Sequence, residues 1–243
     1  MYYEIHGEGK PLVLIHGGGS TIQTTFGNIL PLLIGKHKVI AVELQAHGHT
    51  KDRDTPESFE QDADDVAALL NYLKINKADL FGFSNGGNTA MQVATRHPQL
   101  VDKLILASAF YKREGMMKGF FDGLENANLR DMPALYKEAY LEINNDSIGL
   151  QRMFEKDKAR MLQFKDWKDE VLFSIKFPCL IIIGDKDVIT PEHAVEMAHK
   201  IPNAELLILP GTHGSYIGEA MTAERYSKIP ALTLSVIQEF LEK

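Results

Sequence analysis

Residues 79–87 read Asp-Leu-Phe-Gly-Phe-Ser-Asn-Gly-Gly, and this stretch decides the fold. An apolar strand pattern, 80–83, runs into the turn, and a helical pattern follows at once. Ser84 stands between them with a glycine two residues away on each side, which is the pattern of a nucleophile elbow. Side chains at Gly82 and Gly86 would collide in so sharp a turn, so glycine suits both positions. Taken alone, the stretch also fits an ordinary Gly-Ser-Asn-Gly loop.

Further apolar runs alternate with helical patterns along the rest of the chain. The expected strands cover residues 2–6, 11–15, 38–44, 103–107, 178–183 and 205–209. The expected helices cover residues 24–34, 57–73, 192–200 and 232–241. Near-continuous apolar strands that alternate with helices predict a doubly wound, mostly parallel α/β sheet that is buried on both faces.

Residues 110–174 break this alternation, because no strand pattern occurs there. Short helices are predicted over residues 116–124, 133–143, 147–162 and 166–174. The segment departs from the carboxyl end of a strand, where ligands bind in open α/β sheets. We therefore expect a core of residues 1–109 and 175–243, with residues 110–174 inserted between two strands as a helical lid. Most of its Met and Phe side chains should pack within the lid, and a few should face the site.

Composition and charge argue against several other classes of protein. The 243 residues, 44% of them hydrophobic, suit one large α/β domain with an insertion. A net charge of −7 without a basic patch argues against nucleic acid as a partner. No apolar run is long enough to cross a membrane, and no signal peptide is visible. The single cysteine, Cys179, fits a reducing compartment, so we expect a cytoplasmic protein. The sequence does not fix its oligomeric state, and both a monomer and a homodimer stay open.

A nucleophilic serine needs a base, and the base needs an acidic group to orient it. Four of the histidines follow strand patterns, namely His16, His47, His49 and His213. The turn 184–191 follows another strand and holds two aspartates, Asp185 and Asp187, so turn chemistry alone leaves both open as the acid. Ser84, this turn and His213 each follow a strand pattern, and they come in the chain order Ser, Asp, His, which is an order known for catalytic triads.

The chain resembles the α/β-hydrolase fold superfamily, in its group of small-lid esterases, cofactor-free perhydrolases and carbon–carbon hydrolases. The resemblance rests on residues 16–19 (His-Gly-Gly-Gly), 46–50 (Ala-His-Gly-His-Thr), 82–86 (Gly-Phe-Ser-Asn-Gly), 184–191 and 211–213 (Gly-Thr-His). In that family the acid usually stands three residues after the glycine that ends the strand, which favours Asp187 over Asp185. The family's usual Gly-His-Gly-x-Ser differs from residues 46–50, and we interpret this segment as structural.

The resemblance implies a triad of Ser84, His213 and Asp187 that works without a cofactor or metal. It also implies an oxyanion hole formed by the backbone N–H groups of Gly18 and Asn85. The expected reaction is hydrolysis of a small or medium, largely apolar acyl ester through an acyl-enzyme, with this small molecule as the partner. His16 is interpreted as a residue that braces its loop. No His-Glu-x-x-His or paired Cys-x-x-Cys pattern points to a metal.

Other functions stay open or are disfavoured by particular residues. The same triad would serve a cofactor-free perhydrolase or a carbon–carbon hydrolase, and some non-catalytic receptors of this fold retain a triad. A dinucleotide-binding enzyme is disfavoured because Ile22 occupies the third glycine position of the Gly-x-Gly-x-x-Gly pattern. A haloalkane dehalogenase or epoxide hydrolase would carry an aspartate in place of Ser84.

Overall fold

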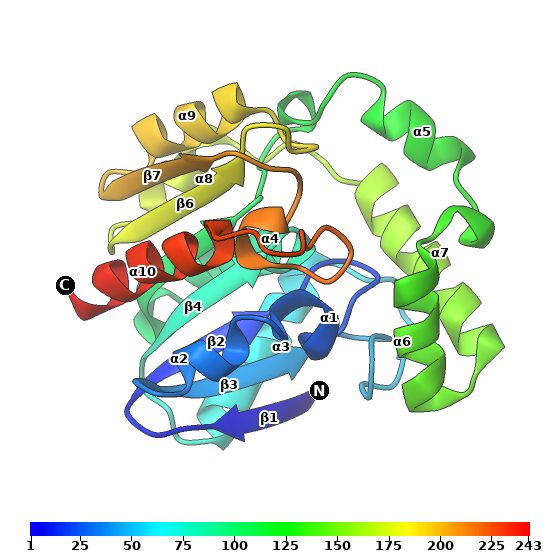
Figure 1. The fold of residues 1–243 in the computed structure, drawn as a ribbon, viewed down its shortest axis with the longest axis horizontal. Helices are drawn as coiled ribbons and strands as arrows, with labels where there is room; N and C mark the ends of the chain where they lie inside the picture. The colour runs from blue at the N-terminus through cyan, green and yellow to red at the C-terminus, as the bar shows by residue number, and fades with distance from the viewer.

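The computed structural model describes residues 1–243, and its centre is a sheet of seven strands (Figure 1). The strands are β1 (Tyr2–His6), β2 (Lys10–Ile15), β3 (His37–Glu43), β4 (Ala78–Phe83), β5 (Val101–Ala107), β6 (Cys179–Gly184) and β7 (Ala204–Leu209). They lie in the order β1-β3-β2-β4-β5-β6-β7, and β1 is the one strand antiparallel to its neighbour. The mostly parallel α/β sheet predicted from the sequence is therefore confirmed.

Helices cover both faces of this sheet, which explains why its strands are apolar along their whole length. These helices are α1 (Ile22–Phe26), α2 (Leu30–Leu33), α3 (Phe59–Tyr72), α4 (Asn85–Arg96), α9 (Pro191–Lys200) and α10 (Ile229–Glu242). Successive side chains of a strand point to opposite faces. Val13 and Ile15 of β2 pack in a cluster with α3, α4 and α9, while Leu12 and Leu14 pack with α1, α2 and α10.

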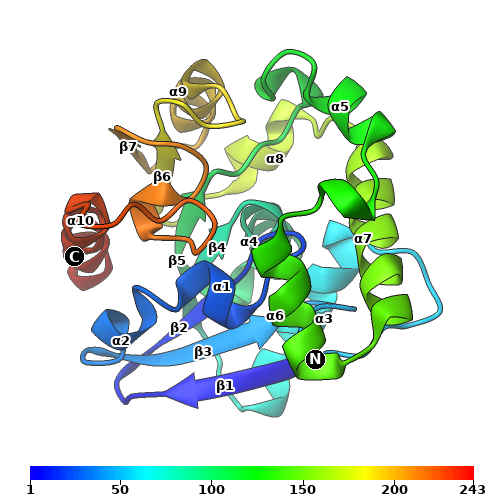
Figure 2. The ribbon, with the colours of Figure 1, turned by 45° about the vertical axis from the view of Figure 1, so that its right-hand side comes forward.

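Between β5 and β6 the chain forms helices and no strand. The helices are α5 (Phe120–Asn126), α6 (Ala134–Asn144), α7 (Ser147–Leu162) and α8 (Asp169–Ser174), with the short 3-10 turns η2 (Arg113–Gly115) before α5 and η3 (Leu129–Asp131) before α6. Two further 3-10 turns lie outside this segment, η1 (Pro98–Leu100) before β5 and η4 (Ser215–Ile217) after β7. Figures 1 and 2 show α5, α6 and α7 beyond the carboxyl ends of the parallel strands, while α8 lies near α9. Met161, Phe164 and Leu172 belong to the main hydrophobic cluster, so this helical insertion shares a core with the sheet.

Two of the expected helices differ from the prediction by more than three residues or by a break. The helix expected over residues 24–34 is divided into α1 and α2, because Gly27 ends α1 and Pro31 stands in the first turn of α2. The helix expected from residue 116 begins at Phe120 instead. Its start is delayed because Gly119 has a left-handed φ of 82°, and because Met116 pairs as an isolated β-bridge with Ile189.

Candidate active site

Ser84 lies in the tight turn between β4 and α4. Its backbone φ is 54°, a left-handed conformation that is strained in a residue with a Cβ atom. A Cβ atom at Gly82 would collide with the backbone of Gly86, and one at Gly86 would collide with the carbonyl oxygens of Ile15 and His16. Glycine at both positions therefore allows the turn to approach the end of β2 closely.

Three side chains from distant segments meet at the carboxyl edge of the sheet. Oγ of Ser84 lies 3.0 Å from Nε2 of His213, which stands in the loop after β7. Nδ1 of His213 lies 2.7 Å from Oδ1 of Asp187, which stands in the turn after β6. The structure thus places a hydroxyl, an imidazole and a carboxylate in one line of hydrogen-bonding groups.

Two further donors hold the Asp187 carboxylate. The Ser108 hydroxyl donates to Oδ2 at 2.6 Å, and the N–H of Ile189 donates to Oδ1 at 3.2 Å. Burial works against ionisation of Asp187, but the charge of His213 and the hydrogen bonds outweigh it and lower the pKa of this carboxyl. Asp187 is therefore a carboxylate at neutral pH. Sequence reasoning missed Ser108, although it directly follows β5 at the same edge of the sheet.

His16 uses both ring nitrogens in contacts with the backbone. Nδ1 donates to the carbonyl of Gly17 at 2.7 Å, and Nε2 accepts from the N–H of Leu44 at 3.0 Å. Burial, together with the nearby charge of His47, lowers the pKa of His16 to about 3. A neutral, fully bonded imidazole of this kind braces its loop.

The remaining candidates from the sequence contact other partners. His49 is 2.9 Å from a carboxylate oxygen of Glu43. Asp185 lies in an exposed turn, where its Oδ1 accepts from the N–H of Gly211 at 2.8 Å. His47 belongs to a buried group of charges that contacts the loop after β2.

Gly18 and Asn85 line the same cavity as Ser84 and His213. The N–H of Gly18 has no acceptor within the protein. Asn85 is the first residue of α4, where backbone N–H groups lack intrahelical acceptors. A Cβ atom on Gly18 would lie 2.5 Å from the amide nitrogen of the Asn85 side chain, so a larger residue would have to displace that side chain. Two N–H groups are therefore available for an oxygen atom bound near Ser84.

A cavity of about 400 Å³ opens onto Ser84 and His213. Apolar side chains of the helical insertion form much of its wall, among them Met116, Phe120, Met132, Met153, Phe154 and Met161. The one cation in the wall is Lys158, whose Nζ donates to the carbonyls of Glu125 and Ala127 at 2.8 and 2.6 Å. The cavity thus offers mostly apolar surface and no unpaired positive charge.

The structure contains neither a cluster of metal ligands nor an ionised thiol. No group of His, Cys, Asp and Glu side chains is arranged to hold a metal ion. Cys179 is buried in β6, and burial raises the pKa of its thiol, so it stays protonated. None of the helices combines the length and the apolar character that spanning a membrane requires.

Comparison with known proteins agrees with this fold. Residues 10–142 match the family model of the alpha/beta hydrolase fold, and the chain therefore belongs to this family of enzymes. It is 30% identical to the human serine hydrolase BPHL over 238 residues, covering 89% of this chain and 78% of that protein. It is 26% identical to a putative non-heme chloroperoxidase of Synechocystis sp., covering 87% of each chain.

A solved structure is also similar over nearly the whole chain. The meta-cleavage product hydrolase from Pseudomonas fluorescens IP01 superposes with a TM-score of 0.80 at 22% identity, covering 99% of this chain and 93% of that one. At this level of identity the likeness shows a shared fold. The family and the curated relatives together identify the protein as an α/β-hydrolase.

Proposed function

We propose that this protein is a serine hydrolase that cleaves esters of small or medium, largely apolar acyl groups. Ser84 would be its nucleophile, His213 its base and Asp187 its orienting acid. The observation that carries this proposal is the pair of distances, 3.0 and 2.7 Å, that joins the three side chains beside a cavity with apolar walls.

The reaction begins when Nε2 of His213 takes the proton from Oγ of Ser84 as that oxygen attacks the ester carbonyl carbon. Asp187 accepts a hydrogen bond from the Nδ1–H group of His213 and so stabilises the imidazolium. The imidazolium then returns a proton to the departing alkoxide, which leaves as the alcohol. A water molecule, deprotonated by His213, attacks the acyl-enzyme and releases the carboxylic acid and free Ser84.

The tetrahedral intermediate of each step carries a negative oxygen. The N–H groups of Gly18 and Asn85 would bind it, because neither is used elsewhere in the protein. Removing one such donor costs about 2.7–4 kcal/mol of transition-state stabilisation. The α4 N-terminus adds a favourable dipole at the same place.

The walls of the cavity favour a neutral acyl group. Its volume of about 400 Å³ lies within the range of about 300–1,000 Å³ typical of small-molecule sites. The carboxylates of Asp131 and Asp157 line it, and Lys158 is already paired with carbonyl oxygens. A substrate whose acyl part bears a carboxylate would therefore find no partner there and would lose its hydration.

Two related reactions fit the same side chains. In a perhydrolase, hydrogen peroxide would replace water as the second nucleophile and give a peracid. In a carbon–carbon hydrolase, the bond broken would be one beside a ketone. The experiment below covers other reactions besides ester hydrolysis because the chain is similar to a putative non-heme chloroperoxidase and to a meta-cleavage product hydrolase.

A screen of p-nitrophenyl esters of increasing acyl length tests the proposal, combined with labelling by a fluorophosphonate and with a Ser84→Ala control. We expect turnover of the short and medium esters and labelling of Ser84 alone. A protein that neither turns over any ester nor takes the label would be a binding protein, and the proposal would be wrong. Peracid formation in hydrogen peroxide that outpaces ester hydrolysis would assign the perhydrolase reaction instead.

A further inference from the structure

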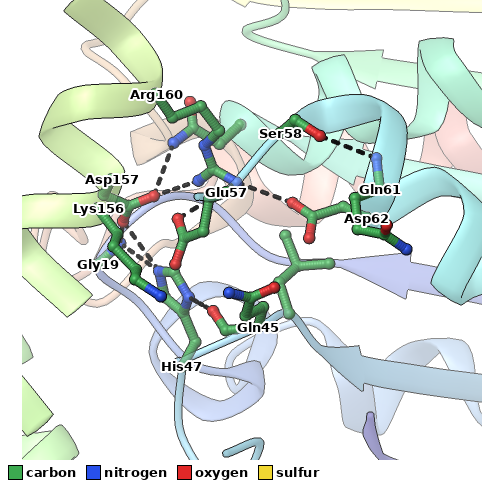
Figure 3. Close-up of polar contacts among 12 residues, drawn as sticks. Gly19, Gln45, His47, Glu57, Ser58, Gln61, Asp62, Lys156, Asp157 and Arg160 are labelled. Atoms are coloured by element: carbon green, nitrogen blue, oxygen red, sulfur yellow. Dashed lines mark hydrogen bonds and ion pairs between the residues drawn. The ribbon is translucent and has the colours of Figure 1, made fainter. Parts of the chain in front are cut away.

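Four buried ionisable side chains gather around Asp157, a partly buried residue of α7 that lines the cavity (Figure 3). Asp157 and Arg160 come from α7, and His47 from the loop after β3. Asp62 lies in the first turn of α3, and Glu57 just before that helix. The Arg160 guanidinium pairs with Asp157, lies 2.8 Å from Asp62 and lies 3.7 Å from Glu57. Such a cluster is costly to desolvate, so its charges must be closely balanced.

Asp157 connects this cluster to the loop after β2. Its Oδ2 accepts a hydrogen bond from the N–H of Gly19 at 2.6 Å, and its Oδ1 lies 3.4 Å from Nδ2 of Asn85. Gly19 directly follows Gly18. One carboxylate from the helical insertion thus contacts Asn85, one of the two proposed oxyanion-hole residues, and the immediate neighbour of Gly18, the other.

His47 is a cation that hydrogen-bonds to the Asp157 carboxylate. Its Nδ1 lies 2.7 Å from the carbonyl oxygen of Gln45, and its Nε2 lies 2.9 Å from Oδ2 of Asp157. An imidazole that donates from both nitrogens carries a positive charge. Burial disfavours that charge, but Asp157 outweighs burial and raises the pKa of His47 to about 9. Nε2 also lies 3.1 Å from the backbone nitrogen of Gly19, but a protonated Nε2 cannot accept a hydrogen bond, so Asp157 is the acceptor for the Gly19 N–H.

The positive partners explain how a carboxylate can lie so near an oxyanion hole. A lone negative charge there would repel the negative oxygen of the tetrahedral intermediate. His47 and Arg160 both contact Asp157 and cancel its field, while its hydrogen bond to Gly19 is retained.

We propose that Asp157 is a positioning residue, which through Gly19 holds the N–H of Gly18 in place for the oxyanion, with His47 and Arg160 neutralising its charge. The inference rests on the proposed function, since it concerns the same oxyanion hole. The competing explanation is that Asp157 merely fastens the insertion to the sheet.

Lys156 offers a matched control for that explanation. It precedes Asp157 in α7, and its Nζ donates to Oδ1 of Asp52 at 2.6 Å and to the carbonyls of Arg53 and Thr55 at 2.6 and 2.8 Å. These bonds also fasten α7 to the core, but they do not touch the loop after β2. Lys156→Met removes them and retains most of the side-chain volume.

The experiment compares wild type, Asp157→Asn, His47→Gln and Lys156→Met. For each, kcat and KM are measured with a p-nitrophenyl ester, and the inhibition constant is measured for a boronic acid, which forms a tetrahedral adduct with a serine. Complete loss of an oxyanion donor lowers kcat by about 100- to 1,000-fold, and misplacing one should cost less. We expect Asp157→Asn to lower kcat about 10- to 100-fold, with KM within threefold and boronate binding weakened in proportion.

His47→Gln keeps a donor to Asp157 but removes the neutralising charge, so it should lower kcat and weaken boronate binding about 10-fold. It also serves as the test if Asp157→Asn does not fold. Lys156→Met should stay within about twofold of wild type in all three quantities. Wild-type kcat and boronate binding in Asp157→Asn and His47→Gln would overturn the inference, as would an equal loss in Lys156→Met. Failure of the proposed function would look different, because wild type itself would then neither hydrolyse the ester nor bind the boronate.

Discussion

Nε2 of His213 lies 3.0 Å from Oγ of Ser84, although 129 residues separate the two along the chain. They meet because β4 and β7 are parallel strands of one sheet, so the loops that follow both strands emerge at the same edge. The geometry is that of a base within reach of the proton it must remove.

Ser84→Ala should abolish ester turnover while leaving the fold intact. The alanine retains the Cβ atom and the same turn but has no nucleophile, and loss of a triad serine lowers kcat by about a millionfold in a comparable hydrolase. Initial rates with a p-nitrophenyl ester and a thermal unfolding curve check both parts. Ser235→Ala, an exposed change in α10, is the control and should behave as wild type. Undiminished turnover in Ser84→Ala would remove the serine from the mechanism.

Asp187→Asn should impair the enzyme far more than Asp185→Asn. An amide at position 187 would favour the wrong tautomer of His213, and the equivalent change in a serine protease lowers kcat by about 10,000-fold. Asp185 contacts the N–H of Gly211 in an exposed turn and does not reach His213, so its change should cost less than tenfold. Values of kcat for the two variants under identical conditions decide between them, and the reverse ranking would assign the acid to Asp185.

The sequence predicted the sheet because each strand is a local apolar run whose pattern does not depend on distant residues. The prediction failed at the start of α5, because the position of that start depends on the β-bridge between Met116 and Ile189, two residues more than seventy positions apart in the chain. It also failed at α1 and α2, where the helical pattern continued across Gly27 although the structure ends α1 there.

Residues of the candidate site were recognisable where a strand end marked them. Ser84, Asp187 and His213 each follow an apolar strand, and the structure places all three at one edge of the sheet. Asp157 has no such marker, because it lies in α7 among other charged residues and resembles an exposed helical position. Its role depends on how α7 packs against Gly19 and His47, which no local pattern encodes.

Phe154→Ala should shift the substrate preference toward longer acyl chains. Phe154 lines the cavity from α7, and removing its ring enlarges the space available to the acyl group. One methylene in an apolar pocket changes kcat/KM by about 10-fold or more, so the ratio of kcat/KM for octanoate over butyrate esters should rise at least that much. Ile148→Ala is the control, because this α7 side chain is 71% exposed. An unchanged ratio in Phe154→Ala would place the acyl group elsewhere.

Glu57 makes the stability of the protein fall between about pH 4.5 and pH 8. Its carboxylate oxygens are buried without a hydrogen bond, and the nearest Arg160 nitrogen is 3.7 Å away. Burial, reinforced by the negative charge of Asp157, raises the pKa of Glu57 from 4.5 to about 8. Between these two pH values the folded protein binds a proton that the unfolded chain has released, so the free energy of unfolding falls as the pH rises.

Glu57→Gln should remove this dependence, because an amide of nearly the same shape carries no charge at any pH. We expect wild type and variant to differ little at pH 5, and the variant to be more stable at pH 9 by up to about 5 kcal/mol. Urea unfolding at intervals from pH 5 to 9 measures the difference. His47 and Asp62 titrate in both proteins, so comparing the two curves isolates Glu57, and Glu239→Gln, an exposed change, should follow wild type. Parallel curves for wild type and Glu57→Gln would mean that Glu57 is already ionised in the folded protein at neutral pH.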